Sequence, residues 1–114
     1  MFTSANVSAE KKELVIDTLG NKVIFTVDIA ETRKERKKGL MFKKELKSTY
    51  GMLFIFPNSQ IVNIWMKNTL IPLDIIYISE DRTITQIIKN AVPEKKTIHS
   101  SKEFTKYVLE INAG

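Results

Sequence analysis

The sequence predicts a small β-rich domain of the α+β class, and three observations lead to this prediction. Short apolar or alternating segments recur from Glu13 onward, about seven in all. Turn-forming pairs such as Gly20-Asn21 and Pro57-Asn58 separate them. Only the segment after Thr32 carries helix signals. We therefore expect one curled sheet or partly closed β-barrel with one or two short helices.

Length and composition fit a single soluble globular domain. The chain has 114 residues, of which 43% are hydrophobic and 27% charged. We expect residues 13–114 to form the domain and residues 1–12 to be a disordered lead, without the apolar core of a signal peptide. No apolar run approaches the roughly 20 residues that cross a bilayer, so no transmembrane segment is expected. The absence of cysteine excludes disulfides and thiolate metal sites.

The first predicted element is a β-hairpin. Leu14 and Ile16 alternate with polar residues, and residues 23–29 alternate in the same way after Gly20-Asn21. Asparagine and glycine adopt the left-handed conformations that tight hairpin turns need. Two antiparallel strands are therefore expected before residue 30.

A short basic helix should follow the hairpin. Thr32 and Glu35 have the T-x-x-E spacing of a capping box, in which each side chain accepts a hydrogen bond from the other residue's backbone N–H. Gly39 can take the left-handed conformation that ends helices. Three apolar residues after the helix are expected in the core: Leu40, Met41 and Phe42.

Five further strands are expected after the helix. The first is a continuous apolar run that ends at Pro57, and the third and fourth form a second hairpin across the polar turn at residues 79–82. The strands are predicted at Met52–Phe56, Ile61–Met66, Leu73–Ile78, Thr83–Ile88 and Phe104–Ile111.

The positive charge of the chain is concentrated in one segment. The net charge of the whole chain is +5, and residues 31–47 alone carry the same excess. Such a lobe can attract nucleic acid or an anionic surface. We favour a solvated helix face, because no Tyr, Trp or His is interleaved among the basic residues to stack on bases. Nucleic acid is thus the less favoured partner of the basic segment 33–47.

The most unusual segment runs from Trp65 to Asp74. It places the only tryptophan beside Lys67, Asn68 and Thr69, between two apolar segments. Asn and Thr also hydrogen-bond their own backbone, so a purely structural turn is the alternative interpretation. An aromatic face with a cation, an amide and a hydroxyl suits a small polar or anionic ligand.

Asp74 strengthens the functional interpretation of this segment. Strand alternation places its carboxylate on the same face as Ile76 and Ile78, and buried carboxylates are rare unless they are paired. We expect Asp74 to be mostly buried and to accept hydrogen bonds from Lys67, from the turn at residues 68–69, or from backbone N–H groups. The candidate ligand-binding residues are Trp65, Lys67, Asn68, Thr69 and Asp74.

Several short motifs resemble those of the DUF192 family of bacteria and archaea. The resemblance runs from about Val27 to the end of the chain and rests on Gly39-Leu40-Met41, residues 51–56, Trp65-Met66-Lys67-Asn68-Thr69, Pro72-Leu73-Asp74-Ile75 and Val108-Leu109-Glu110 with Ala113-Gly114. Ile64 stands where family members commonly have Phe. The resemblance implies a small β-rich domain, often secreted or lipoprotein-anchored, without an established reaction, cofactor or catalytic residue.

Other catalytic and metal-binding patterns are weak. His99 is the only histidine, so neither a catalytic triad with Ser100 and Ser101 nor a histidine-rich metal site is expected. Phosphate-binding glycine motifs are missing from the sequence. We therefore expect no metal and no cofactor.

Three functions remain as hypotheses. We favour a ligand-binding or accessory module with a shallow pocket at residues 65–74. A small enzyme with Asp74 as general base and Lys67 as electrostatic stabiliser is less favoured, because no nucleophile or second acid accompanies them. The third is an anionic-surface or nucleic-acid binder that uses the basic segment 33–47, whose binding would collapse as salt rises.

Overall fold

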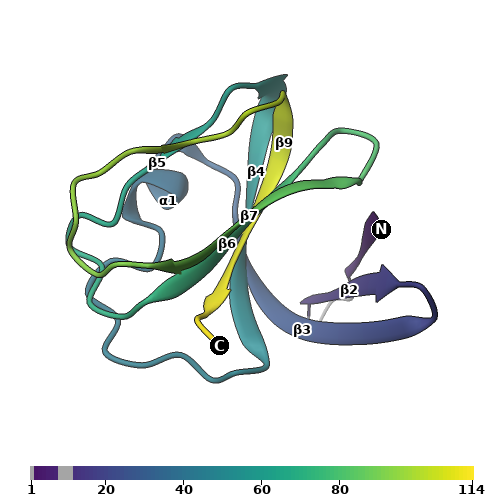
Figure 1. Ribbon diagram of the computed structural model, residues 1–114, viewed down its shortest axis with the longest axis horizontal. Coiled ribbons are helices and arrows are strands. Elements are labelled where there is room, and N and C mark those ends of the chain that lie inside the picture. Colours follow the sequence, from purple (N-terminus) through teal and green to yellow (C-terminus); the bar gives the residue numbers. More distant parts are fainter. Residues whose placement is uncertain (1, 8–11) are drawn as a thin grey trace.

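The computed structural model describes residues 2–7 and 12–114 of the chain (Figure 1). This part contains one short helix and nine strands. They are β1 (Phe2–Val7), β2 (Lys12–Thr18), β3 (Asn21–Ala30), α1 (Arg33–Lys38), β4 (Tyr50–Gln60), β5 (Asn63–Ile64), β6 (Leu73–Ile78), β7 (Ile84–Ala91), β8 (His99–Ser100) and β9 (Thr105–Asn112).

Seven strands form one mixed sheet in the order β1-β2-β3-β4-β9-β6-β7, and β5 pairs with β8 separately. Only β3 and β4 pair in parallel, because α1 and the loop after it carry the chain back to the starting end of the sheet. The prediction of a β-rich domain is confirmed. The described sheet ends at β1 and β7 and does not close, so the partly closed barrel is not confirmed, and one six-residue helix is little support for the α+β label.

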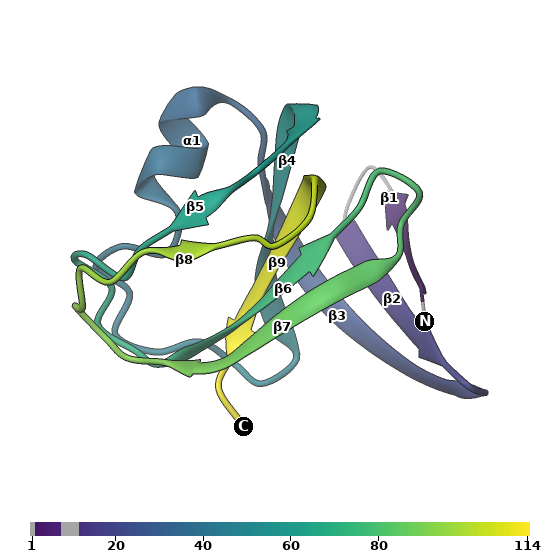
Figure 2. The ribbon, with the colours of Figure 1, turned by 45° about the horizontal axis from the view of Figure 1, so that its top comes forward.

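The two faces of this sheet are buried in separate apolar clusters. Phe54, Ile75 and Val108 belong to the cluster on the side of α1, whereas Leu53, Ile76 and Leu109 belong to the opposite cluster, which packs on the β2–β3 hairpin. Successive residues alternate between clusters because strand side chains point to opposite faces. Figure 2 shows α1 and the β5–β8 ribbon on one side of strands β4, β9 and β6. The α1 side of the sheet is the side on which the candidate site lies.

The predicted hairpin and helix cap are both confirmed. β2 and β3 pair antiparallel with Leu14 opposite Phe25. The Glu35 backbone N–H donates to Thr32 Oγ1 at 3.1 Å, and the Thr32 N–H donates to Glu35 Oε1 at 2.9 Å. The Thr32 and Glu31 N–H groups both donate to the Glu35 carboxylate, and these hydrogen bonds lower the pKa of Glu35. Gly39 ends the helix with φ at 48°, in the left-handed region.

Two sequence predictions need correction near the ends of elements. Phe2–Val7 of the expected disordered lead form β1, which pairs with the otherwise open edge of β2, and residues 8–11 lie outside the described residues. Phe42 was expected in the core but is 64% exposed. Its φ of 64° turns the chain, and its N–H donates to the Asn68 carbonyl at 2.9 Å.

Several strand bounds differ from the prediction, and two of the differences change how the chain pairs. β4 continues past Pro57 to Gln60. Its pairing with β9 is interrupted between Ile55 and Gln60. Pro57, which has no backbone N–H to donate, is tolerated in this interruption. The strand expected at 61–66 is reduced to β5. The Val62 N–H donates to the Ser101 hydroxyl and the Met66 N–H donates to the Lys95 carbonyl, so neither residue joins a ladder of strand hydrogen bonds. The predicted β6 has the observed bounds.

Gly51 allows β4 and β9 to approach closely. A Cβ atom added at Gly51 would lie 2.7 Å from the Glu110 carbonyl oxygen and 2.9 Å from the Ile111 side chain. Both neighbours are parts of a central strand, so neither can move without disturbing the sheet. The residue at position 51 must therefore be glycine for this pairing.

Replacing Gly51 with alanine should destabilise the fold strongly. We expect Gly51→Ala to lower the free energy of unfolding by about 3 kcal/mol, measured by chemical denaturation, because the added methyl group overpacks two central strands. Gly20→Ala is the control: nothing lies within 4 Å of its added Cβ, so only backbone strain of about 1 kcal/mol is expected. Equal losses for the two variants would contradict this explanation.

Removal of the helix cap should have a smaller effect. Thr32→Ala leaves the Glu35 backbone N–H without its acceptor, so we expect the free energy of unfolding to fall by about 1 kcal/mol. Thr32→Ser, which keeps the hydroxyl, should restore most of it. A thermal melt that Thr32→Ala does not change would show that the cap contributes nothing.

Candidate functional site

Strand β9 carries a glutamate on an otherwise apolar face of the sheet. Alternation along β9 places Glu110 with Val108 on the side of α1. The residues paired with Glu110 on the neighbouring strands are Met52 and Ile75, both apolar. Glu110 is only 5% exposed. An ionisable side chain thus lies in an apolar environment at the centre of the sheet.

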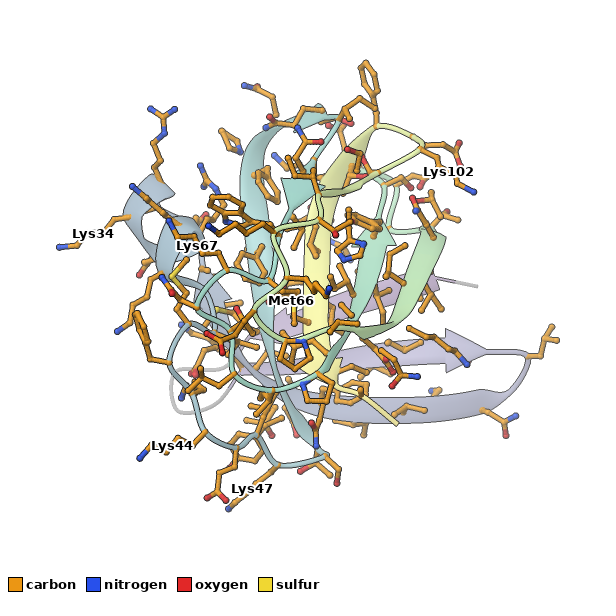
Figure 3. The ribbon with its side chains drawn as sticks, turned by 60° about the vertical axis from the view of Figure 1, so that its left-hand side comes forward. Lys34, Lys44, Lys47, Met66, Lys67 and Lys102 are labelled. Carbon is orange, nitrogen blue, oxygen red and sulfur yellow. The ribbon has the colours of Figure 1, made fainter. Side chains whose placement is uncertain are left out.

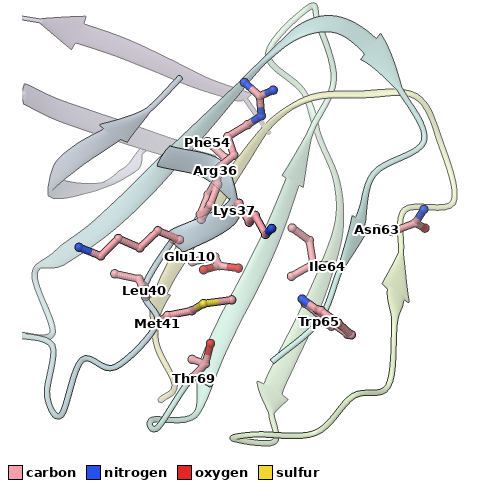
Figure 4. Close-up of a pocket in the computed structure, with 12 residues that line it drawn as sticks. Arg36, Lys37, Leu40, Met41, Phe54, Asn63, Ile64, Trp65, Thr69 and Glu110 are labelled. Atoms are coloured by element: carbon pink, nitrogen blue, oxygen red, sulfur yellow. The ribbon is translucent and has the colours of Figure 1, made fainter. Parts of the chain in front are cut away.

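A cavity of about 160 Å³ opens over Glu110 (Figure 4). Helix α1 and the turn after it form one wall, β5 and the residues after it form the other, and the sheet forms the base. The lining residues are Arg36, Lys37, Lys38, Gly39, Leu40, Met41, Phe54, Asn63, Ile64, Trp65, Thr69 and Glu110.

The carboxyl group of Glu110 faces this cavity without a partner in the described part of the chain. Glu110 has no hydrogen bond or ion pair with any described residue. Yet the described residues include no fully buried side-chain oxygen that lacks a partner. The Glu110 oxygens have no partner but are not counted as fully buried, so they must keep some exposed surface. That surface lies on the cavity, which Glu110 lines. Whatever fills the cavity can therefore reach these oxygens.

Burial changes the proton affinity of this group. Loss of solvation in the apolar surroundings raises the pKa of Glu110 from 4.5 to about 7. Tyr77 lies on the same face, and its pKa is raised by burial and by the negative charge of Glu110. The Tyr77 hydroxyl donates to the His99 carbonyl at 2.6 Å. Glu110 can thus exchange a proton near neutral pH, as either a hydrogen-bond acceptor or an acid–base group would require.

The cations of α1 do not all play the same role. The Arg36 guanidinium donates to the Ile55 carbonyl at 3.2 Å and to the Glu31 carbonyl, and it lies 5.0 Å from the centroid of the Phe56 ring. Lys37 and Lys38 are exposed beside the cavity. The solvated-face interpretation therefore fits the two lysines but not Arg36, which anchors the helix to β4.

Three of the predicted site residues are close to the cavity. Trp65 lines it and is 45% exposed. The Lys67 ammonium lies 5.3 Å from the centroid of the Trp65 ring. Thr69 also lines the cavity and is buried, with its hydroxyl donating to the Lys67 carbonyl at 3.4 Å. Figure 3 shows this side of the molecule, with Lys67 and the buried Met66 in the segment that carries them.

Asn68 and Asp74, like Lys67, are not among the residues that line the cavity. Asn68 has φ at 57°, and its carbonyl accepts from the Phe42 N–H, so it shapes the turn. Asp74 lies on the face of Ile76, as expected, but that face is opposite to Glu110. The Asp74 carboxylate accepts from the Asn90 backbone N–H at 2.9 Å, and the side chain is half-buried.

Sequence reasoning missed Glu110, although a signal for it was present. β9 is apolar on both faces at Val108 and Leu109, and a charged residue next in such a strand requires a reason. Within residues 2–7 and 12–114, no three His, Cys, Asp or Glu side chains gather as a metal site. The described helix is also too short to cross a membrane.

The stability of the protein should decrease as the pH rises through neutrality. The pKa of Glu110 is higher in the folded state, at about 7, than the ordinary value of 4.5, so folding favours the protonated form. Its contribution is full below about pH 4.5 and should be lost, by about 3 kcal/mol in all, as the pH rises from about 4.5 to about 7. Chemical denaturation at pH 5 and pH 8 measures this change in the free energy of unfolding.

Glu110→Gln provides the comparison for this pH dependence. The amide keeps the shape of the side chain and does not titrate, so the variant should lose this part of the slope and be more stable than the wild type at pH 8. Identical slopes for the two proteins would show that Glu110 is not desolvated.

Comparison with known proteins places the chain among uncharacterised relatives. The chain is similar to a crystal structure of a protein of unknown function from Novosphingobium aromaticivorans, with 35% identity, a TM-score of 0.88, and coverage of 97% of this chain and 82% of that one. A protein from Sinorhizobium meliloti described as a "putative transcription regulator" is 40% identical, with a TM-score of 0.87 and coverage of 91% and 81%. No curated protein matches the chain.

The family comparison agrees with the motifs in the sequence. The family model of DUF192, described as "Uncharacterized ACR, COG1430", matches residues 15–114. This match includes both walls of the cavity and Glu110. The chain therefore belongs to the DUF192 family.

Proposed function

We propose that this protein is a binding module for a small polar or anionic ligand, held in the cavity between α1 and Trp65. The observation that carries the proposal is the Glu110 carboxyl group, which is buried, unpartnered and open to the cavity. A buried polar group without a partner costs free energy of about 1–3 kcal/mol, which a ligand that hydrogen-bonds to it recovers.

The cavity walls provide complementary groups. Trp65 offers an aromatic surface, Thr69 a hydroxyl, and Lys37 and Lys38 positive charge at the rim. The Lys67 ammonium lies over the Trp65 ring, Asn68 shapes the turn, and Asp74 accepts a hydrogen bond from the Asn90 N–H near the start of β6. An apolar pocket with a few polar groups is the usual form of a small-molecule site.

An enzyme is the less favoured alternative. Asp74 and Glu110 lie on opposite faces of the sheet, so the pairing of Asp74 with Lys67 has no support near the cavity. Glu110 is the better acid–base candidate, but no nucleophile with an adjacent base accompanies it among the lining residues. Binding requires fewer groups than catalysis and fits those present.

The description of the Sinorhizobium relative raises nucleic-acid binding as a second candidate. The basic residues of α1 would carry it. A helix of six residues is only about 9 Å long, and Arg36 is already committed to β4. Binding to duplex DNA that weakens steeply as salt rises would support this candidate, whereas ligand binding that persists in salt supports the cavity.

Amide chemical shifts can test the proposal. We expect titration with glucose, glucuronate, acetate or inorganic phosphate to shift the Trp65 indole N–H and the Thr69 amide for at least one of these probes. Trp65→Ala should weaken that binding about tenfold, since one aromatic contact contributes about 1.4 kcal/mol. Phe104→Ala is the matched control, because Phe104 is an exposed aromatic residue outside the cavity.

Two results would overturn the proposal. One is the absence of shifts at the cavity with every probe. The other is an equal loss of affinity in Trp65→Ala and Phe104→Ala, which would mean that the probe binds aromatic residues without regard to the cavity.

A further inference from the structure

The polar side chains around Glu110 leave its carboxyl as the acceptor that a ligand must satisfy. Arg36 bonds to backbone carbonyls, the Thr69 hydroxyl donates to the Lys67 carbonyl, and Asn63 Oδ1 accepts from the Ser100 hydroxyl at 2.6 Å. Lys37 and Lys38 are exposed at the rim. Among the described residues no group donates to the Glu110 carboxyl, so a ligand in the cavity can supply the donor.

Charge limits what this donor can be. A cationic ligand would pass the lysines of α1 at the rim, and an anion placed at the base would meet the Glu110 carboxylate. A neutral hydroxyl group avoids both repulsions and donates one hydrogen bond to a carboxylate. The base of the cavity thus favours a hydroxyl, and the rim accepts either a neutral group or an anion.

The size and the wall of the cavity limit the rest of the ligand. Its volume of about 160 Å³ is below the roughly 300 Å³ at which sites for drug-sized molecules begin, so it accommodates a single ring. Trp65 lines the wall and is half-exposed (Figure 4), so its aromatic surface can pack on the apolar C–H surface of such a ring.

We propose that the cavity binds one sugar ring, neutral or acidic, with a ring hydroxyl donating to Glu110 and the ring packed against Trp65. This inference rests on the proposed binding function and specifies its ligand class. An acidic sugar would place its carboxylate at Lys37 and Lys38, on the rim.

The fluorescence of Trp65, the only tryptophan, reports occupancy directly. The probes are glucose, galactose, mannose and N-acetylglucosamine, together with glucuronate and galacturonate. Acetate and inorganic phosphate are the controls, since they carry charge but no ring. We expect at least one of the sugars to change the fluorescence with saturation, and to do so more tightly than acetate or phosphate.

Glu110→Gln tests the hydrogen bond at the base. The amide oxygen accepts more weakly than a carboxylate, so the affinity for the sugar at pH 8 should fall about tenfold. In the wild type the affinity should fall about tenfold from pH 8 to pH 6, because the carboxylate becomes protonated below its pKa of about 7. Glu110→Gln should lack this dependence. A thermal melt checks that the variant is folded.

Other groups near Glu110 must be separated from it in this test. Arg36, Lys37 and Lys38 also line the cavity, and Tyr77, whose pKa is raised by burial, packs on the same face of the sheet. His99 lies beside them, because its backbone carbonyl accepts a hydrogen bond from the Tyr77 hydroxyl. A pH dependence that persists in Glu110→Gln would belong to another of these groups and would overturn the inference.

The outcomes separate this inference from the proposed function. Binding of acetate or phosphate at the cavity without binding of any sugar would overturn the sugar assignment and leave the binding module intact. The absence of binding by all eight probes would overturn both. Sugar binding that Glu110→Gln leaves unchanged would overturn the role of Glu110.

Discussion

The insertion of β9 between β4 and β6 is the constraint on which the rest of the structure depends. β9 pairs with both neighbours along most of its length and supplies side chains to both apolar clusters. Without it, the β1–β4 half and the β6–β7 half of the sheet would share no ladder. The pairing is close enough that position 51 has no room for a side chain. Sheet continuity, core formation and the base of the cavity all follow from this one strand.

The same strand explains why the site is where it is. β9 is an interior strand with paired neighbours on both sides, and a side chain on its α1 face is covered by the helix and by β5. A glutamate there loses solvation, which raises its pKa and reduces stability when it is ionised. Residues that reduce stability at a buried position are commonly retained for function. The alternation of β9 also separates this carboxyl from Asp74, which faces the opposite cluster.

Local signals in the sequence predicted local structure well. The hairpin at Gly20, the cap at Thr32 and the bounds of β6 depend on residues within a few positions of one another, and all three were predicted. The face of Asp74 was also predicted, since alternation is local. Which layer covers that face depends on how distant strands pair. Local patterns therefore could not show that Asp74 would lie outside the lining of this cavity. Glu110 was missed for the same reason: its surroundings come from α1, β4 and β5, which are far away in the sequence.

The position of β9 in chain order affects how the protein can be synthesised. β9 follows every strand that it joins, so the ribosome releases both halves of the sheet before the strand that unites them. Until then, the facing edges of β4 and β6 and their apolar side chains have no native cover. Unpaired edges of this kind promote association between chains. The nascent chain should therefore depend on chaperones, or on rapid completion, more than a protein whose central strands are made first.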